Sequence, residues 1–343
     1  MNKKNIFRVL LLVSTVVSFF YVPWPIVTAW LKPVPNTIQE QLNQTINYGF
    51  DGVILYVDVA GKPPAFYAEG WHNTEQKITA KPNAFFKIAS IDKLYTAVAI
   101  TKLIGKNKLD LNKSLAYYFP ELNGKIEYAD KITVKMMVQH RSGIPNYTNT
   151  PNFWNNPTQN AEEALELVKG LPASFKPNTD YEYSNTNYLL LSMLIDKTAG
   201  KSKFNYIKEV ILNPLALKNT YASLKDVPID NLMSGYYVGI NNDIKTTNYG
   251  SMIATAEDVG IFLRALNNGN LFTGTENEIY ASIYKYNHTG LIPGYQSIAE
   301  YHKNIDAVVV QFTNTTDFSG YNWNLSEISY NRIIKIIEKN NSK

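Results

Sequence analysis

The chain has 343 residues, of which 45% are hydrophobic and 13% aromatic, which is enough for one large domain or two with a packed core. The formal net charge is only +4 and no run of basic residues stands out, which argues against a nucleic-acid-binding protein. Cysteine is absent, which excludes disulfides and thiolate chemistry, and the four histidines do not pair at the spacing of metal ligands, so no metal site is expected.

The first 31 residues are predicted to lie outside the folded domain, as a signal peptide or a membrane anchor. Three basic residues near the start precede an uncharged run over residues 9–31. Residues 9–22 have the length of a signal-peptide apolar region, and small residues at 27–29 fit a cleavage site. Alternatively, the uncharged run spans roughly 34 Å as a helix, enough for a membrane anchor. Both interpretations place the domain outside, so we expect an exported protein at the periplasmic or extracellular face.

The next part of the chain is predicted to form an α+β fold with two lobes. Periodicity and turn residues indicate a helix over 36–49, a hairpin over 52–60 and 65–71, mostly helical structure from 90 to about 271, paired strands over 295–301 and 305–313, and a helix over 325–338. Strands from both ends are expected to join one antiparallel sheet that is flanked by the N- and C-terminal helices. The helical lobe would be inserted between sheet segments 50–86 and 280–340 of a domain covering 36–340. A cleft between lobes is the expected place for a site.

A serine and a lysine three residues apart stand at the start of the helix predicted after residue 90. Ser90 and Lys93 form an S-x-x-K pattern before a strongly apolar run. Residues i and i+3 share a helix face, so Lys93 would lie beside Ser90, and a buried, uncharged lysine can accept the serine's proton. The alternative is that Ser90 caps the helix and Lys93 is a surface charge. The same pattern also recurs at residues 282–285.

A tyrosine and an asparagine precede the next apolar helix, which is predicted over 186–199. Tyr183 and Asn185 form a Y-x-N pattern that would place a phenol and an amide on a turn facing the Ser90 helix. A phenol next to a lysine can shuttle the serine's proton. The alternative is that Asn185 is an ordinary cap, and a second Y-x-N pattern stands at residues 147–149.

The third pattern is a His-Thr-Gly tripeptide at the start of the C-terminal strands. His288, Thr289 and Gly290 precede Leu291, whose backbone N–H is a candidate second donor to an oxyanion. Gly290 is expected to let a substrate backbone approach closely. The alternative is a hairpin end with an incidental histidine.

The order of these three patterns resembles the serine β-lactamase and DD-peptidase superfamily, in its class C-like branch. That branch carries S-x-x-K, Y-x-N and K/H-T-G in the same order. Supporting stretches resemble it too, notably ITVKMMVQHRSGIPNY at 132–147 and SMIATAEDVGIFLRAL at 251–266. The resemblance covers roughly residues 36–338 and implies the β-lactamase/transpeptidase fold.

The resemblance also implies roles for the patterned residues. Ser90 would be the acyl-accepting nucleophile, Lys93 and Tyr183 would manage its proton, and which of these two is the base is disputed within the superfamily. Asn185 would hold the substrate, His288 and Thr289 would line the strand edge, and the N–H groups of Ser90 and Leu291 would bind the oxyanion. His288 stands where many β-lactamases have lysine, which weakens recognition of a substrate carboxylate at neutral pH.

The resulting functional expectation is an exported serine hydrolase that forms an acyl-enzyme on Ser90, resembling a D-alanyl-D-alanine carboxypeptidase or a β-lactamase-related peptidase. The expected substrates are small peptides, peptidoglycan fragments or acyl esters, with β-lactam binding and no cofactor. The alternatives are an esterase or acyl transferase with the same machinery, and a non-catalytic sensor or scaffold that binds a cell-wall ligand. An uncleaved N-terminal segment would add a membrane contact.

Overall fold

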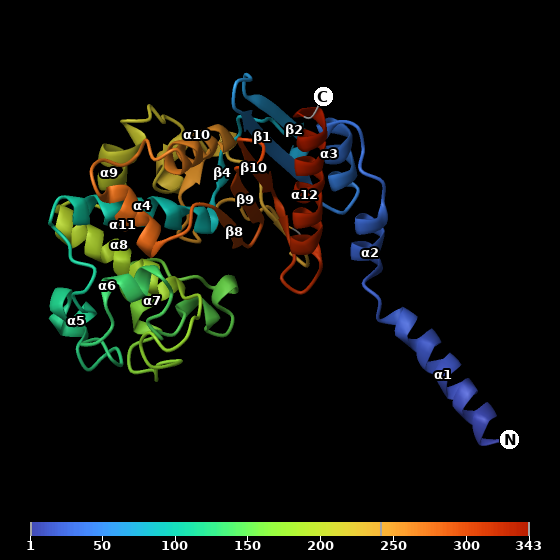
Figure 1. Cartoon of the computed structure of the whole chain (residues 1–343), viewed down its shortest axis with the longest axis horizontal. Coiled ribbons are helices and arrows are strands. Elements are labelled where there is room, and N and C mark those ends of the chain that lie inside the picture. Colours follow the sequence, from blue (N-terminus) through green and yellow to red (C-terminus); the bar gives the residue numbers. More distant parts are fainter. Residues whose placement is uncertain (1, 241, 342–343) are drawn as a thin grey trace.

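A six-stranded antiparallel sheet lies at the centre of the computed structural model, which describes residues 2–240 and 242–341 (Figure 1). Its order is β3-β2-β1-β10-β9-β8. The strands are β1 (Gly52–Val59), β2 (Ala65–Asn73), β3 (Ile78–Thr79), β8 (His288–Ile292), β9 (Tyr295–His302) and β10 (Ala307–Thr313). β1 pairs with β10, from Val53 opposite Thr313 to Val59 opposite Ala307. The expectation that strands from both ends of the chain share one sheet is therefore confirmed.

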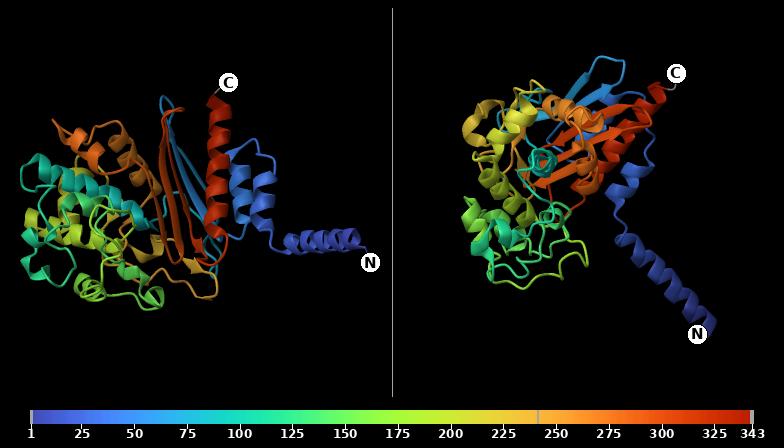
Figure 2. Two further views of the ribbon diagram at one scale, coloured as in Figure 1. Left: turned by 60° about the horizontal axis from the view of Figure 1, so that its bottom comes forward. Right: turned by 60° about the vertical axis from the view of Figure 1, so that its left-hand side comes forward.

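The two helices that flank one face of the sheet come from opposite ends of the domain. They are α3 (Ile38–Ile46) and α12 (Asn322–Asn341), and Figure 2 shows them side by side next to the sheet. Thr37 and Glu40 form a reciprocal capping box that fixes the start of α3. Alternate β1 residues face these helices, because successive side chains in a strand point to opposite faces, and Leu55 packs there with Ile333.

The other face of the sheet carries α10 (Ala256–Asn267) and the helical lobe, in which α4 (Asp92–Gly105) is the central helix. Ten residues of α4 are buried, so it is enclosed on most sides. Helix α8 (Asn185–Ala199) packs against α4 and ends at Gly200, which adopts the left-handed conformation at φ +68°. The other helices of four or more residues are α5 (Leu115–Tyr118), α6 (Val134–Val138), α7 (Ala161–Glu166), α9 (Lys203–Ile207) with a π-helical continuation (Lys208–Leu212), and α11 (Glu276–Ile283).

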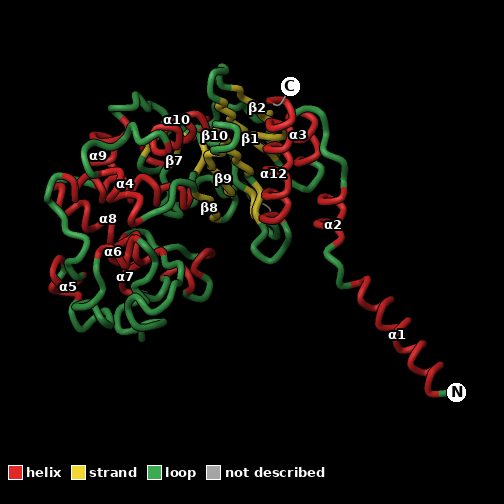
Figure 3. Tube along the Cα trace, in the orientation of Figure 1, coloured by secondary structure: helices red, strands yellow, loops and turns green. Residues whose placement is uncertain are grey.

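The segment predicted as a helical lobe from 90 to about 271 is more mixed than its periodicity indicates. Figure 3 shows long loops between its helices, together with short strands. The short strands are β4 (Phe86–Lys87), β5 (Thr220–Tyr221), β6 (Tyr236–Tyr237), β7 (Ile253–Ala254) and β11 (Thr315–Thr316). Helix α10 contacts β10, β1 and β9, so it belongs with the sheet. The boundaries of the two lobes stay a prediction.

The N-terminal segment forms two helices, α1 (Lys3–Phe20) and α2 (Trp24–Leu31), and α1 projects away from the domain (Figure 1). Within the described residues, neither helix alone is long and apolar enough to cross a bilayer. The pair satisfies length and composition together, with a bend of 79° between them. Membrane anchoring and export stay predictions.

Candidate active site

Ser90 lies in a single 3-10 turn, η1 (Ala89–Ile91), that runs directly into α4. Ala89 adopts a left-handed φ of +49°, which is unfavourable for a residue with a Cβ. Its N–H donates to Ser251 Oγ at 2.8 Å, and the neighbouring carbonyl of Ile88 accepts from Ser297 Oγ at 3.0 Å. The turn that carries the serine is therefore fixed from two sides, as a strained functional segment requires.

Two polar side chains converge on the hydroxyl of Ser90. The phenol of Tyr183 donates to Ser90 Oγ at 2.7 Å, and Lys93 Nζ donates to the same atom at 3.1 Å. Lys93 is 7% exposed and lies 5.0 Å from the centre of the Tyr183 ring. The N-cap of α4 is Ile91, which offers no capping side chain. The alternatives of a capping Ser90 and a surface Lys93 are therefore wrong.

Asn185 completes this constellation from the first turn of α8. Its Oδ1 accepts from Lys93 Nζ at 2.9 Å, and its Nδ2 donates to Thr148 Oγ1 at 3.1 Å. The backbone N–H of Asn185 donates to Asn146 Oδ1 at 3.0 Å. These partners orient the amide, so Asn185 is more than a helix cap. Thr148 belongs to the second Y-x-N pattern, which thus contributes to the site through its middle residue.

His140 is a site residue that sequence reasoning did not single out. Its ring stacks on Tyr183 with centroids 4.4 Å apart, and its Nδ1 accepts from the Ser184 N–H at 3.1 Å. Burial, and then the charge of Lys93, lowers the pKa of His140 to about 3, so the ring is neutral at pH 7. The only signal in the sequence was its place in the stretch HRSG. We regard it as a positioning residue for the Tyr183 ring.

His288 lies at the start of β8, 4% exposed, with both ring nitrogens occupied. Nδ1 is 2.5 Å from the Thr289 carbonyl, which can only accept, so Nδ1 donates and Nε2 accepts from Tyr284 Oη at 2.9 Å. Burial, followed by the charges of Lys285 and Lys93, holds the pKa of His288 well below its usual value. The imidazole is therefore uncharged and cannot supply a cation at this position.

The free edge of β8 borders the site. β8 is the last strand of the sheet, and a two-residue turn joins it to β9, with Ile292 opposite Tyr295. Hydrogen bonding alternates along an antiparallel pair, so the N–H groups of Thr289 and Leu291 face the free edge. This geometry is compatible with Leu291 as an oxyanion donor.

Gly290 requires a correction. A Cβ there would lie 2.3 Å from Ser297 Oγ and 2.6 Å from the Ile88 carbonyl oxygen, so the glycine faces the turn that carries Ser90. It does not line the pocket at Ser90. From the sequence, we expected Gly290 to let a substrate backbone approach closely. In the structure, it instead lets β8 pack directly on the backbone of the turn that carries Ser90.

The predicted side chains meet in a pocket of about 520 Å³, a size typical of small-ligand sites. Seven of the eight predicted residues line it, and the eighth is Gly290. The seven are Ser90, Lys93, Tyr183, Asn185, His288, Thr289 and Leu291. Aromatic side chains form further walls, namely Tyr147, Phe153, Trp154, Tyr249 and Trp323. The pocket thus combines a polar floor with walls suited to apolar parts of a substrate.

Lys285 is one of three lysines that line the pocket, with Lys93 and Lys203. No hydrogen bond or ion pair holds its amine within residues 2–240 and 242–341, whereas Lys203 in the same wall pairs with Asp92 at 2.7 Å. Burial and the charge of Lys93 lower the pKa of Lys285. It belongs to the S-x-x-K copy at 282–285, whose Ser282 instead donates to the Ile279 carbonyl. The lysine of that copy therefore reaches the site, and its serine does not.

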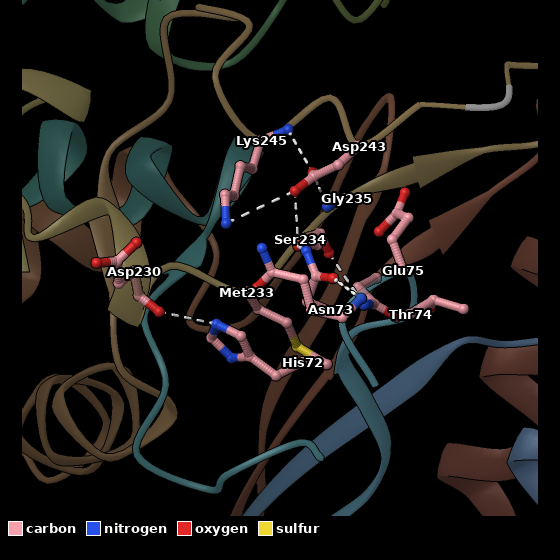
Figure 4. Close-up of polar contacts among 12 residues, drawn as sticks. His72, Asn73, Thr74, Glu75, Asp230, Met233, Ser234, Gly235, Asp243 and Lys245 are labelled. Carbon is pink, nitrogen blue, oxygen red and sulfur yellow. Dashed lines mark hydrogen bonds and ion pairs between the residues drawn. The ribbon is translucent and has the colours of Figure 1, made fainter. Parts of the chain in front are cut away.

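A polar network ties a long loop of the pocket wall to the end of β2 (Figure 4). His72 Nε2 lies 3.0 Å from the Asp230 carbonyl, and Asn73 Nδ2 donates to Ser234 Oγ at 2.9 Å. Ser234 Oγ in turn donates to Asp243 at 2.7 Å. The segment fixed in this way leads directly into residues 249–251, which line the pocket.

Lys87 on β4 holds the same loop closer to the site. The side chain is 2% exposed, and its Nζ donates to the Thr247 carbonyl at 2.7 Å. The amine lies over the rings of Tyr295 and Tyr249, at 4.9 and 5.5 Å from their centres. Burial lowers the pKa of Lys87 to about 7. Tyr249 thus packs on a buried amine as it forms the pocket wall.

Comparisons with known proteins identify the family and the fold of the chain. A family model described as Beta-lactamase matches residues 34–282. Protein flp of Staphylococcus aureus (strain MW2) is 28% identical over 194 residues, which are 54% of this chain and only 38% of that protein.

Two solved structures show the same fold. The D-amino acid amidase from Ochrobactrum anthropi SV3, complexed with L-phenylalanine amide, has a TM-score of 0.78 at 22% identity and covers 88% of this chain and 98% of its own. The penicillin binding protein from Bacillus halodurans has a TM-score of 0.73 at 19% identity, over 88% of this chain and 100% of its own.

Proposed function

The chain belongs to the beta-lactamase family of hydrolases, and on that premise we propose that it is a serine hydrolase that cleaves the terminal amide bond of D-alanyl-D-alanine-type peptides through an acyl-enzyme on Ser90. The observation that carries this proposal is the convergence of Tyr183 at 2.7 Å and Lys93 at 3.1 Å on the Ser90 hydroxyl. A nucleophile and its proton acceptors must lie within hydrogen-bonding distance for such a step.

Acylation follows from these contacts. Ser90 Oγ bonds to the substrate carbonyl carbon, and its proton passes to whichever of the two groups within reach, Tyr183 or Lys93, is in its deprotonated form. The N–H groups of Ser90 and Leu291 stabilise the negative charge that develops on the carbonyl oxygen. The C–N bond then breaks, and the leaving amine takes up the proton. The products at this stage are a free amine and an ester on Ser90.

Deacylation returns the enzyme to its starting state. Water attacks the ester carbonyl, its proton passes to the same Tyr183–Lys93 pair, and Ser90 Oγ regains a proton as the acid leaves. Asp92 is the single carboxylate in the pocket wall of the described chain, and it pairs with Lys203. We therefore assign the activation of water to the tyrosine–lysine pair rather than to a carboxylate base.

We assign the selection of the substrate to the charged and uncharged side chains that line the pocket. His288 is neutral with both nitrogens occupied, so it cannot pair with a substrate carboxylate. Lys285, three residues earlier, lines the pocket with its amine unpaired within the described residues. A charged amine in a partly enclosed site attracts a carboxylate. This favours a peptide with a free C-terminal carboxylate over a neutral ester or amide.

Two reagents test the proposal on the purified protein, namely a fluorescent penicillin and a p-nitrophenyl acyl ester. We expect covalent penicillin labelling that is lost in Ser90→Ala and in Lys93→Ala, while Lys106→Ala, an exposed lysine at the end of the same helix, keeps it. Release of D-alanine from a D-alanyl-D-alanine peptide would complete the evidence. An active Lys93→Ala protein would count against the proton-transfer scheme.

Other results would identify the alternatives. Ester turnover without labelling or D-alanine release would indicate an esterase or acyl transferase, because the same nucleophile then works on neutral acyl groups. Binding of peptidoglycan fragments with no turnover of any reagent would indicate a sensor or scaffold. Either result would overturn the peptidase proposal.

A further inference from the structure

Arg332, in α12, ties the end of α2 to the folded domain. Its guanidinium is 4% exposed and donates to the backbone carbonyls of Lys32 at 2.5 Å and Pro33 at 2.6 Å, with a longer contact of 3.4 Å to the Ala29 carbonyl. Its remaining contacts are to two side chains of α3, Gln41 at 2.7 Å and Gln44 at 3.1 Å. A buried guanidinium needs these acceptors, because an unpaired buried charge is strongly unfavourable.

The apolar side of α2 is also part of the domain. Ala29 is 1% exposed and packs in a small cluster with Phe50 and Leu325, next to α12. The opposite side of α2 is open, with Trp30 71% exposed and Trp24 45% exposed. α2 therefore has one face that completes the fold and one exposed aromatic face, on which Trp24 stacks with Phe19 of α1 at 5.8 Å between ring centres.

These contacts bear on the cleavage site suggested by residues 27–29. Cleavage after Ala29 would remove that residue from its apolar cluster and place a new terminal amine on Trp30, close to the buried guanidinium of Arg332. From this we infer that α2 is retained in the working protein as part of the domain, and that α1 with the exposed face of α2 binds a phospholipid bilayer.

The dimensions of the two helices fit that partner. No residue of α1 is buried, and its 18 residues extend about 27 Å, so α1 reaches the length and composition of a membrane-spanning segment only together with α2. α2 is held by Arg332 and cannot straighten to lengthen α1. The 79° bend instead places α2 at the surface of the bilayer where α1 enters it.

The side chains at the two ends of α1 agree with this orientation. Tyr21 is 82% exposed and, with Trp24 and Trp30, stands at the end of α1 that adjoins the domain, where aromatic residues favour the headgroup region. The opposite end carries Lys3, Lys4 and Arg8, whose long basic side chains can reach lipid phosphates. The domain and its pocket would then lie close to the surface of the bilayer.

The first test follows the N-terminal segment in cells. The full chain is expressed in a bacterial host, membranes are separated, and the protein is mapped by mass spectrometry. We expect peptides within residues 9–29 to remain part of the protein, which should need detergent for release and resist an alkaline carbonate wash. Soluble protein that begins at residue 30 would overturn the inference.

The second test separates the two helices. A protein that begins at residue 23 lacks α1 but keeps α2, and one that begins at residue 34 lacks both. Because α1 has no buried residues, we expect the first to match the full chain in Tm and to lose membrane binding. The second should melt roughly 5 °C or more lower, since Arg332 loses backbone acceptors. Equal Tm values for the two shortened proteins would show that α2 is not part of the fold.

Discussion

The phenol of Tyr183 donates a 2.7 Å hydrogen bond to the hydroxyl of Ser90, although the two residues are 93 positions apart. The contact joins the start of α4 to the loop before α8. These two helices are neighbours in the lobe. The ring of His140 stacks on the phenol ring, with centroids 4.4 Å apart, and keeps it in place. The reactive geometry is therefore a property of how the helices of the lobe pack.

Tyr183→Phe tests this contact directly. The substitution keeps the ring and its stacking but removes the hydroxyl that bonds to Ser90, so we expect acylation to slow by about 100- to 10,000-fold. The second-order rate constant for penicillin or ester acylation measures the effect. Tyr181→Phe is the matched control, since Tyr181 is exposed and does not line the pocket at Ser90. Equal losses in both variants would contradict the role of Tyr183.

Lys285→Gln tests the selection of a carboxylate. Loss of the unpaired amine should raise KM roughly tenfold for a D-alanyl-D-alanine peptide with a free carboxylate, which corresponds to about 1.4 kcal/mol. The same peptide with an amidated C-terminus should be unaffected, because it carries no charge at that end. Steady-state kinetics on both peptides separates the two cases. Lys303→Gln, in the exposed turn between β9 and β10, is the control. An equal change in KM for both peptides would refute the assignment.

Gly290→Ala tests the packing of β8 on the backbone of the turn that carries Ser90. The new methyl would lie 2.6 Å from the Ile88 carbonyl oxygen, which is backbone and cannot swing away. We expect the free energy of unfolding to fall by about 1–3 kcal/mol, as in other overpacked sites. Acylation should slow as well, because Ile88 is two residues from Ser90. Urea denaturation and penicillin labelling measure the two effects. A stable and fully active variant would disprove the role assigned to this glycine.

The buried Lys87 predicts that the folded protein becomes more stable as pH rises above 7. The pKa of Lys87 is about 7 in the folded protein and has its ordinary value of 10.5 in the unfolded chain. Between pH 7 and pH 10.5, the unfolded chain therefore binds more protons than the folded protein does. Stability then rises with pH, by roughly 2–3 kcal/mol from pH 7 to pH 9. Urea denaturation at the two pH values measures this difference. Lys87→Met should remove most of it, because methionine fills the space without a titrating group. A variant with the same pH dependence as the native chain would argue against Lys87 as the cause.

Much of the fold could be predicted from local patterns. The β-branched residues of β1, the turn residues before β2, the apolar faces of α3 and α12, and the glycine after α8 each indicate an element within a short stretch, and the structure has each of them. α10 was harder to place, because an amphipathic helix shows that one face is buried but not which partner buries it. Strands β4, β5 and β7 have two residues each, so they are too short to be predicted from a periodic pattern in the sequence.

The sequence by itself determined which functional groups are present and in what order. These are a serine and a lysine one helical turn apart, a Y-x-N turn and a His-Thr-Gly strand, in an order typical of one superfamily. Only the tertiary structure decided which copies of these patterns meet. It brings Lys285 into the pocket and leaves Ser282 outside, turns Gly290 toward the Ile88 carbonyl, and stacks His140 on Tyr183. The physical reason is that hydrogen bonds and ring contacts act over a few ångströms in space, and residues far apart in sequence reach that distance only when the helices and the sheet have packed.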